Sequence, residues 1–158
     1  KSADNQPLVT NLGSMELPIL TSEQSHFLET QRVGRLATVD ATFMPHVVPV
    51  CYARNNAVVY ISLDEKPKRA KAWALKRVRN ILQNPRAALV VDHYDDADWS
   101  RLGWVMLRGR AEIIERGVEQ AAALANLLSR YDQYSAMCLE DRPVIALRIE
   151  KVTSWGAL

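Results

Sequence analysis

The sequence of 158 residues has few of the features that mark several large protein classes. Cysteine occurs only twice, as Cys51 and Cys138, which lie far apart in the chain. Two such residues give neither the paired spacing of a zinc site nor a dense disulfide scaffold, so we expect a reduced, cytoplasmic setting. No apolar run approaches the roughly 18–20 residues that cross a bilayer, so we expect no membrane partner.

Several catalytic and binding motifs are also missing. The sequence has no Gly-x-Ser-x-Gly elbow, no P-loop and no Gly-x-Gly-x-x-Gly fingerprint. These absences disfavour a hydrolase of the elbow type and a dinucleotide-binding site of the Rossmann type. The three histidines, His26, His46 and His93, are widely separated and form no i, i+4 pair, so we expect no metal site.

The composition that remains is typical of one globular domain. Apolar residues make up 48% and charged residues 24% of the chain, which excludes a largely disordered protein. A length of 158 residues suffices for one domain with a real core. We expect residues 1–18 to be a flexible, polar tail and residues 19–158 to be a single domain.

Hydrophobic periodicity predicts an alternation of hairpins and helices. Helical patterns begin at Thr21 or Ser22 and run to Gln31, recur from Ala70 to Leu82, and fill much of residues 115–131. The strand-like segments are residues 32–39, 46–54, 57–62, 86–94, 102–114 and 144–152. Asn55-Asn56 predicts a tight hairpin turn, because asparagine tolerates positive φ. Without a βαβα alternation, the chain reads as an α+β fold: a six-stranded antiparallel split β-barrel with two to three flanking helices.

The most distinctive chemical feature is a basic segment at residues 66–79. It holds seven lysines and arginines and no acid. The net charge of the whole chain is +2, so the residues outside this segment carry a net charge of −5. Lys66, Lys68 and Arg69 lie between a strand end and a helix start, where cations and helix N–H groups suit a phosphate group. For the cations further along the helix, an ordinary solvated face is an equal alternative.

Nucleic acid is a weaker interpretation of the same segment. No helix-turn-helix, zinc-finger or RNA-recognition signature accompanies the charges, and the rest of the chain is acidic. Trp99 stands apart from the other tryptophans, because it lies among Asp95, Asp96 and Asp98 rather than in a predicted core element. We therefore expect no nucleic-acid partner, and burial of Trp99 in the core is less assured than for the other tryptophans.

The order of short motifs resembles that of a known family. The motifs are Val-Gly-Arg-Leu-Ala-Thr-Val at 33–39, Pro-His-Val-Val-Pro-Val at 45–50, Val-Tyr-Ile-Ser at 59–62, the basic residues 66–69, Arg-Asn-Ile-Leu-Gln-Asn-Pro-Arg at 79–86, Asp-Trp-Ser at 98–100 and Arg-Gly-Arg-Ala at 108–111. Together with the closing strand to Trp155, this set is similar to the pyridoxamine 5′-phosphate oxidase-like split-barrel family over roughly residues 20–156. It looks closest to the deazaflavin-dependent branch.

The resemblance implies a homodimer with a flavin-type cofactor, either FMN or the 8-hydroxy-5-deazaflavin coenzyme F-420, between the subunits. It implies that the cofactor is bound by Val47, Val48, Pro49, Val50, Ser62, Lys66, Lys68, Arg69, Lys71, Arg77 and Trp99. The 47–50 segment would run along the ring, the serine and the cations would hold the phosphate, and Trp99 would reach the cofactor from its own or the partner subunit.

Two functions are compatible with these expectations. The first is an oxidoreductase that transfers a hydride between the cofactor and a small-molecule substrate. Because a flavin or deazaflavin carries its own hydride chemistry, the missing acid/base motif does not count against it. The alternative is a carrier or sensor that binds the cofactor without turnover.

Overall fold

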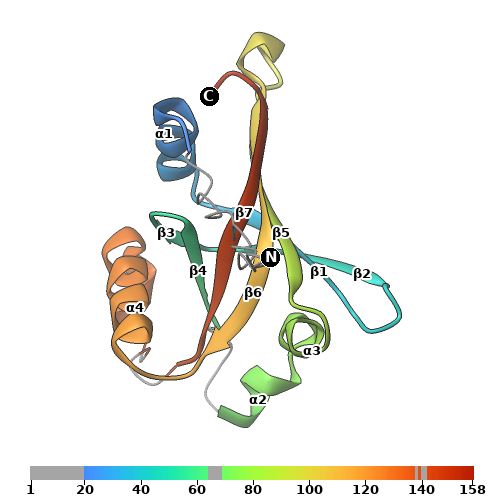
Figure 1. Ribbon diagram of the computed structural model, residues 1–158. Helices are drawn as coiled ribbons and strands as arrows, with labels where there is room; N and C mark the ends of the chain where they lie inside the picture. The colour runs from blue at the N-terminus through green and yellow to red at the C-terminus, as the bar shows by residue number, and fades with distance from the viewer. Residues whose placement is uncertain (1–19, 64–68, 138, 140–141) are drawn as a thin grey trace, which may run out of the picture.

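The computed structural model describes residues 20–63, 69–137, 139 and 142–158, so the tail predicted over residues 1–18 lies outside the described residues. The strands are β1 (Gly34–Val39), β2 (Pro45–Val50), β3 (Ala53–Asn55), β4 (Val58–Ser62), β5 (Arg86–His93), β6 (Gly103–Ile114) and β7 (Val144–Gly156). The α-helices are α1 (Ser22–Thr30), α2 (Arg69–Ala74), α3 (Lys76–Gln83) and α4 (Val118–Arg130), and two 3-10 turns are η1 (Trp99–Arg101) and η2 (Asp132–Ala136) (Figure 1).

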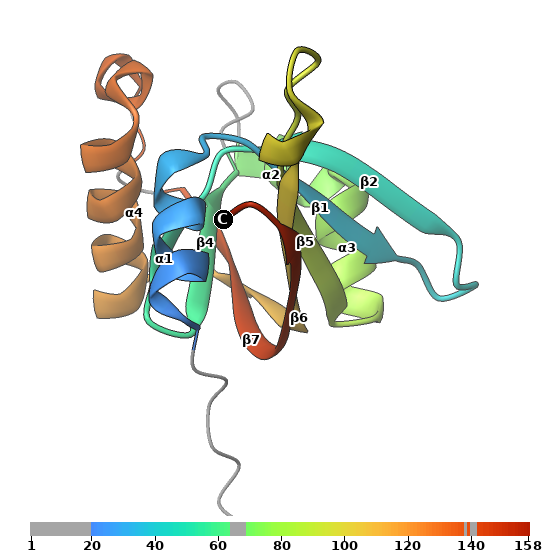
Figure 2. The ribbon, with the colours of Figure 1, turned by 90° about the horizontal axis from the view of Figure 1, so that it is seen from above.

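The described strands form one antiparallel sheet that curls into a split barrel. The strand order is β2-β1-β5-β6-β7-β4-β3, and each neighbouring pair is antiparallel. The two edge strands, β2 and β3, are separated by only two residues, so Val50 and Ala53 lie at most about 11 Å apart. Because the two edges are joined by so short a link, the sheet must bend round on itself, as the view from above shows (Figure 2). The predicted α+β class and antiparallel arrangement are confirmed.

The described chain has seven strands, and the prediction of six is wrong in this detail. The segment predicted as one strand over residues 46–54 divides into β2 and β3. At the division, the N–H of Tyr52 donates to the hydroxyl of Tyr131, 3.0 Å away, and its carbonyl accepts from that hydroxyl at 2.8 Å. A side chain thus takes the place of a strand partner, which lets the chain leave one edge of the sheet and join the other.

The number of helices also differs from the prediction of two to three. The helix predicted from Ala70 to Leu82 is broken at Leu75, whose backbone is extended (φ −62°, ψ 133°). Leu75 packs against the main core, and its carbonyl accepts the N–H groups of Val78 and Arg79, which begin α3. The break therefore gives four α-helices among the described residues and starts α3 at Lys76.

The last strand extends to Gly156, four residues past the predicted end, and contains a bulge. The register of β6 against β7 shifts at Arg108 and Gly109, so that Glu150 has no opposite residue. A Cβ atom on Gly109 would lie 1.8 Å from the carbonyl oxygen of Arg148, so only glycine allows this close approach.

Two apolar clusters hold the fold together. The larger fills the barrel, and its fully buried members include Leu36, Leu89, Leu107 and Leu147. The smaller lies between α4 and strands β3, β4 and β7, and is centred on Leu127. Because β4 has the barrel on one side and α4 on the other, four of its five residues are buried.

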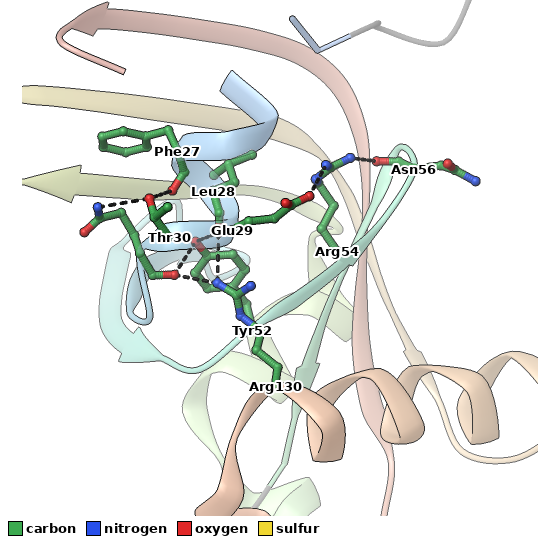
Figure 3. A network of polar contacts seen from close by, with 9 residues as sticks. Phe27, Leu28, Glu29, Thr30, Tyr52, Arg54, Asn56 and Arg130 are labelled. Atoms are coloured by element: carbon green, nitrogen blue, oxygen red, sulfur yellow. Dashed lines mark hydrogen bonds and ion pairs between the residues drawn. The ribbon is translucent and has the colours of Figure 1, made fainter. Parts of the chain in front are cut away.

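A polar network fixes the link between β2 and β3 to the helices (Figure 3). The hydroxyl of Tyr52 and the guanidinium of Arg130 both donate to the carbonyl oxygen of Leu28, at 2.6 and 2.9 Å. The Arg130 guanidinium also lies 5.1 Å from the centre of the Tyr52 ring. Burial raises the pKa of Tyr52 well above its ordinary value, so its hydroxyl stays a donor. This network satisfies carbonyl groups at the end of α1, which the helix itself cannot satisfy.

Candidate functional site

A pocket of about 220 Å³ opens where the ends of β2 and β4 approach one another. Its lining comes from five parts of the chain: Val33, the segment Pro49–Cys51, the pair Ile61 and Ser62, Arg77, and Tyr134. Four of the residues predicted to bind a cofactor, Pro49, Val50, Ser62 and Arg77, thus lie together. They come from β2, the edge strand at one end of the sheet, from β4 near the other end, and from α3.

Two residues of this lining each carry a buried polar atom that has no hydrogen-bond partner among the described residues. These atoms are the Oγ of Ser62 and the Nε of Arg77, and both are fully buried. Ser62 itself is only 3% exposed. A buried donor without an acceptor costs about 1–3 kcal/mol, and such groups are rare in folded proteins. Both groups can donate to a phosphate oxygen, so this donor set fits a phosphate group.

The first turn of α3 has the same preference for an anion. It contains Lys76, Arg77 and Arg79 but no acidic residue, whereas acids are the residues favoured at a helix N-terminus. Lys76 is occupied by Asp40, whose carboxylate lies 2.8 Å from its Nζ, and Arg79 is exposed and does not line the pocket. Of the described cations, Arg77 is the one in the pocket wall.

Asp40 keeps Lys76 away from the pocket. Its carboxylate accepts hydrogen bonds from Lys76, from the Thr42 hydroxyl and from the N–H of Met44. These bonds, that from Lys76 above all, hold the pKa of Asp40 far below its ordinary value. The carboxylate is therefore ionised at any physiological pH, and the ion pair persists.

Strand β2 presents an apolar, exposed surface next to the pocket. Val47 is 59% exposed and Pro49 is exposed, while Val48 packs against the barrel core. As an edge strand, β2 pairs with β1 alone among the described strands, so its other edge has backbone groups that no strand uses. Such a strand can support a flat ring and hydrogen-bond to its rim.

The remaining predicted ligands lie elsewhere or are not described. Lys66 and Lys68 lie outside the described residues, and only the backbone of Arg69 and Lys71, in α2, is described. Trp99, in η1, is 69% exposed and is not among the residues that line the pocket. It therefore does not reach the pocket of its own chain.

Sequence reasoning missed four pocket residues. Cys51 and Ile61 directly adjoin Val50 and Ser62, which were predicted to bind the cofactor, so their positions next to these residues could have indicated them. Val33 precedes β1 and shows no pattern of its own. Tyr134 lies in η2, more than 50 residues from Arg77, and nothing in its sequence surroundings indicates the pocket.

A second hollow, of about 430 Å³, lies on the outer face of the sheet. Its floor is made of small and apolar residues such as Ala37, Val39 and Ala88, and its rim carries Arg86, Arg108, Glu150 and Lys151. Within the described part of the chain, no three potential ligands of His, Cys, Asp or Glu type gather as a metal site would require. None of the helices described is long and apolar enough to span a bilayer.

Comparisons with known proteins point to one family. The sequence model of the family "Pyridoxamine 5'-phosphate oxidase" matches residues 20–156. A 5a,11a-dehydrotetracycline/5a,11a-dehydrooxytetracycline reductase of Streptomyces rimosus is 30% identical over 97 residues, which are 61% of this chain and 66% of the reductase. The match thus spans slightly less than two thirds of that relative.

Solved structures share the fold at low sequence identity. A conserved hypothetical protein of Mycobacterium tuberculosis has a TM-score of 0.65 at 21% identity, covering 91% of this chain and 90% of that one. The heme storage protein HutZ of Vibrio cholerae has a TM-score of 0.65 at 17% identity, with 84% and 91% covered. A FAD-binding protein of Mesorhizobium loti has a TM-score of 0.58 at 24% identity, with 87% and 93% covered.

Proposed function

Since the chain belongs to the pyridoxamine 5′-phosphate oxidase family, we propose that it is an oxidoreductase that uses FMN or coenzyme F-420 to reduce a small organic substrate. The observation that carries this proposal is the pair of buried, unpartnered donors on Ser62 and Arg77. The cofactor's phosphate group accepts from both. The similarity to a reductase supports the catalytic part of the proposal.

The phosphate accounts for an otherwise unfavourable arrangement. Hydrogen bonds to a charged group contribute about 1.5–3 kcal/mol each, more than neutral ones, and they remove the cost of the buried donors. Arg77 supplies the opposite charge, and Ser62 supplies a second donor from the end of β4. The two side chains come from different elements, β4 and α3, so they fix both the position and the direction of the bound group.

The ring system lies along β2. Val47 and Pro49 give it an apolar support, and the unused edge of β2 provides backbone groups for its polar rim. When bound, a flavin or deazaflavin supplies the hydride. The protein's part is to orient the ring, to exclude water from one face and to leave the other face to the substrate.

No carboxylate or imidazole lines the pocket among the described residues. The described lining of the phosphate site therefore offers no carboxylate or imidazole for proton transfer, and Ser62 and Arg77 serve in binding. This separation fits a cofactor whose reactive ring lies outside the phosphate pocket, over β2.

We also propose that the working unit is a homodimer. The outer face of β1, β2, β5 and β6 carries a hollow with an apolar floor, and Val47 and Trp99 are largely exposed. An exposed apolar surface of this kind is typical of an interface. Since Trp99 does not line the pocket of its own chain, a second copy is needed for Trp99 to reach a cofactor.

Titration with FMN and with coenzyme F-420, followed by fluorescence, tests the proposal. Ser62→Ala and Arg77→Gln should each weaken binding at least tenfold, about 1.4 kcal/mol, because each removes one phosphate donor. Arg79→Gln is the matched control, since it removes the same charge from an exposed position of the same helix and should leave affinity unchanged.

The Ser62→Ala variant also separates binding from folding. Because the Ser62 hydroxyl is buried without a partner, its removal should leave the free energy of unfolding unchanged or raise it. If neither cofactor binds the wild-type protein at tens of micromolar, the proposal is wrong.

The second candidate is a protein that binds the cofactor without turnover. It is favoured by the lack of a carboxylate or imidazole in the described lining of the pocket and by the shared fold with a protein whose name assigns it heme storage. An assay of the reduced cofactor with 5a,11a-dehydrotetracycline, the substrate in the reductase relative's name, and then with other small acceptors, distinguishes the two. Sustained, protein-dependent oxidation of the cofactor supports the enzyme; tight binding without it supports the carrier.

A further inference from the structure

Cys51 lies in the wall of the same pocket as Ser62 and Arg77. It is the first of the two residues that link β2 to β3, and it is half-buried. One side of Cys51 packs against the smaller apolar cluster under α4, and the residue borders the pocket from there. No carboxylate among the described residues lines this pocket, and the charged residue of its lining is Arg77.

The pocket shows independently that it is built for a ligand. The Ser62 side chain is fully buried, and its hydroxyl has no partner among the described residues. Arg77 presents a second unpartnered donor from α3. A volume of about 220 Å³ holds a phosphate group beside these donors, and an adduct at Cys51 would enter the same space.

We propose that Cys51 is a modification site for low-molecular-weight disulfides, and that its modification excludes the phosphate group from the pocket. The inference rests on the proposed function, since the group displaced is the cofactor's phosphate. Addition at Cys51 would therefore turn cofactor binding off, and reduction by a thiol would restore it. Because Arg77 lies in the same wall, disulfides that carry carboxylates should react faster than neutral ones of similar size.

The modification is a thiol–disulfide exchange. The Cys51 thiol loses its proton, and the thiolate attacks one sulfur of the disulfide. A new S–S bond forms at Cys51 while the S–S bond of the reagent breaks. The leaving thiolate takes up a proton, so the protein thiol is oxidised and half of the reagent is reduced.

The test uses the full chain with Cys138→Ser, which leaves Cys51 as its one cysteine. The protein is treated with oxidised glutathione or with the neutral 2-hydroxyethyl disulfide, and the adduct is followed by mass spectrometry with and without saturating inorganic phosphate. We expect phosphate to slow labelling at least tenfold, and the adduct to lower FMN affinity at least tenfold until dithiothreitol removes it. Cys51→Ser with Cys138 retained is the control, and the same treatment should not change its FMN affinity.

The outcomes separate this inference from the proposed function. If the unmodified protein binds none of FMN, coenzyme F-420 and phosphate, the proposed function is wrong and the inference falls with it. If either cofactor binds but labelled protein binds it equally well, or phosphate does not slow labelling, this inference alone is wrong. Failure of Cys51 to react in the folded protein while it reacts in urea also overturns it.

Discussion

Phe43 has a backbone conformation that is unfavourable for a residue with a bulky side chain. It follows the turn between β1 and β2 with φ +63°, in the left-handed region that glycine and asparagine tolerate best. Its side chain is also 77% exposed, so burial does not compensate for the strain. The turn is held instead by Asp40, whose carboxylate accepts from the N–H groups of Thr42 and Met44 at 2.9 and 3.0 Å.

Phe43→Gly should therefore stabilise the protein. Glycine removes the strain of the left-handed conformation, and part of that gain is offset by its greater freedom in the unfolded chain. We expect the free energy of unfolding to rise by about 0.5–1 kcal/mol, measured by urea denaturation.

Ala41→Gly in the same turn is the control. Ala41 does not have positive φ, so glycine there only adds freedom to the unfolded chain, and stability should fall by about 0.4–1 kcal/mol. Equal effects of the two substitutions would mean that the strain at Phe43 is negligible.

At the same scale, the sequence predicts some conformations and misses others. Asn56 has φ +50°, as expected from the Asn-Asn pair, because asparagine tolerates the left-handed region better than most residues do. Phe43 has no such signature, since its strain is imposed by the hydrogen bonds of Asp40. Ser62 and Arg77 could be predicted from the ordered motifs, but Tyr134 could not, because only the packing of η2 against β4 brings it near.

At the scale of elements, an ionic network attaches α4 to the sheet. Glu119 of α4 accepts from the Nη1 and Nη2 atoms of Arg148 on β7, at 2.9 and 3.0 Å, and from the hydroxyl of Tyr60 on β4, at 2.8 Å. These hydrogen bonds, those from Arg148 first, lower the pKa of Glu119. Burial raises the pKa of Tyr60 to about 12, so its hydroxyl remains a donor throughout the neutral range.

The lowered pKa gives this network a defined pH dependence. A carboxylate with a lower pKa in the folded state stabilises the protein above its unfolded value, about 4.3, and this contribution is lost as pH falls through the folded value. The stability advantage of wild type over Glu119→Gln should therefore be full at neutral pH and shrink below about pH 4. Urea denaturation at several pH values measures it.

Asp132→Asn is the control, because Asp132 is exposed at the start of η2 and forms no ion pair among the described residues. Its stability difference from wild type should change much less over the same range. A Glu119→Gln difference that stays constant with pH would show that α4 is held by apolar packing alone.

Most helices and strands could be predicted from local patterns, and the errors share one cause. The first helix, with Thr21 as its cap, lies where the sequence places it, because capping is local. The break between β2 and β3 depends on Tyr131, nearly 80 residues away, and that at Leu75 depends on packing against the barrel. Neither partner is visible within the segment that breaks.

At the scale of the whole molecule, a substitution on the outer face of the sheet tests the proposed homodimer. Val47→Asp places a charge on the exposed apolar part of β2 without burying it in the monomer. If this face joins two copies, the variant should sediment as a monomer where wild type sediments as a dimer, since an unpaired charge in an interface is strongly unfavourable.

Val118→Asp is the matched control, because Val118 is 90% exposed at the start of α4, where an acid is tolerated well. It should leave the sedimentation of the protein unchanged. A wild-type protein that is monomeric at high concentration, or a Val47→Asp variant that remains dimeric, would contradict the assembly.

The strand order also governs when the chain can fold during synthesis. β4 pairs with β3 and β7 alone, and β7 is formed by residues 144–156. β4, made early at residues 58–62, therefore lacks its second partner until residues 144–156 have been made, more than 80 residues later. At about 5–20 residues per second, this leaves the backbone edge of β4 unpaired and its apolar side chains exposed for several seconds. The nascent chain is therefore a natural client for chaperones, and slowing of translation before β7 should lengthen that exposure.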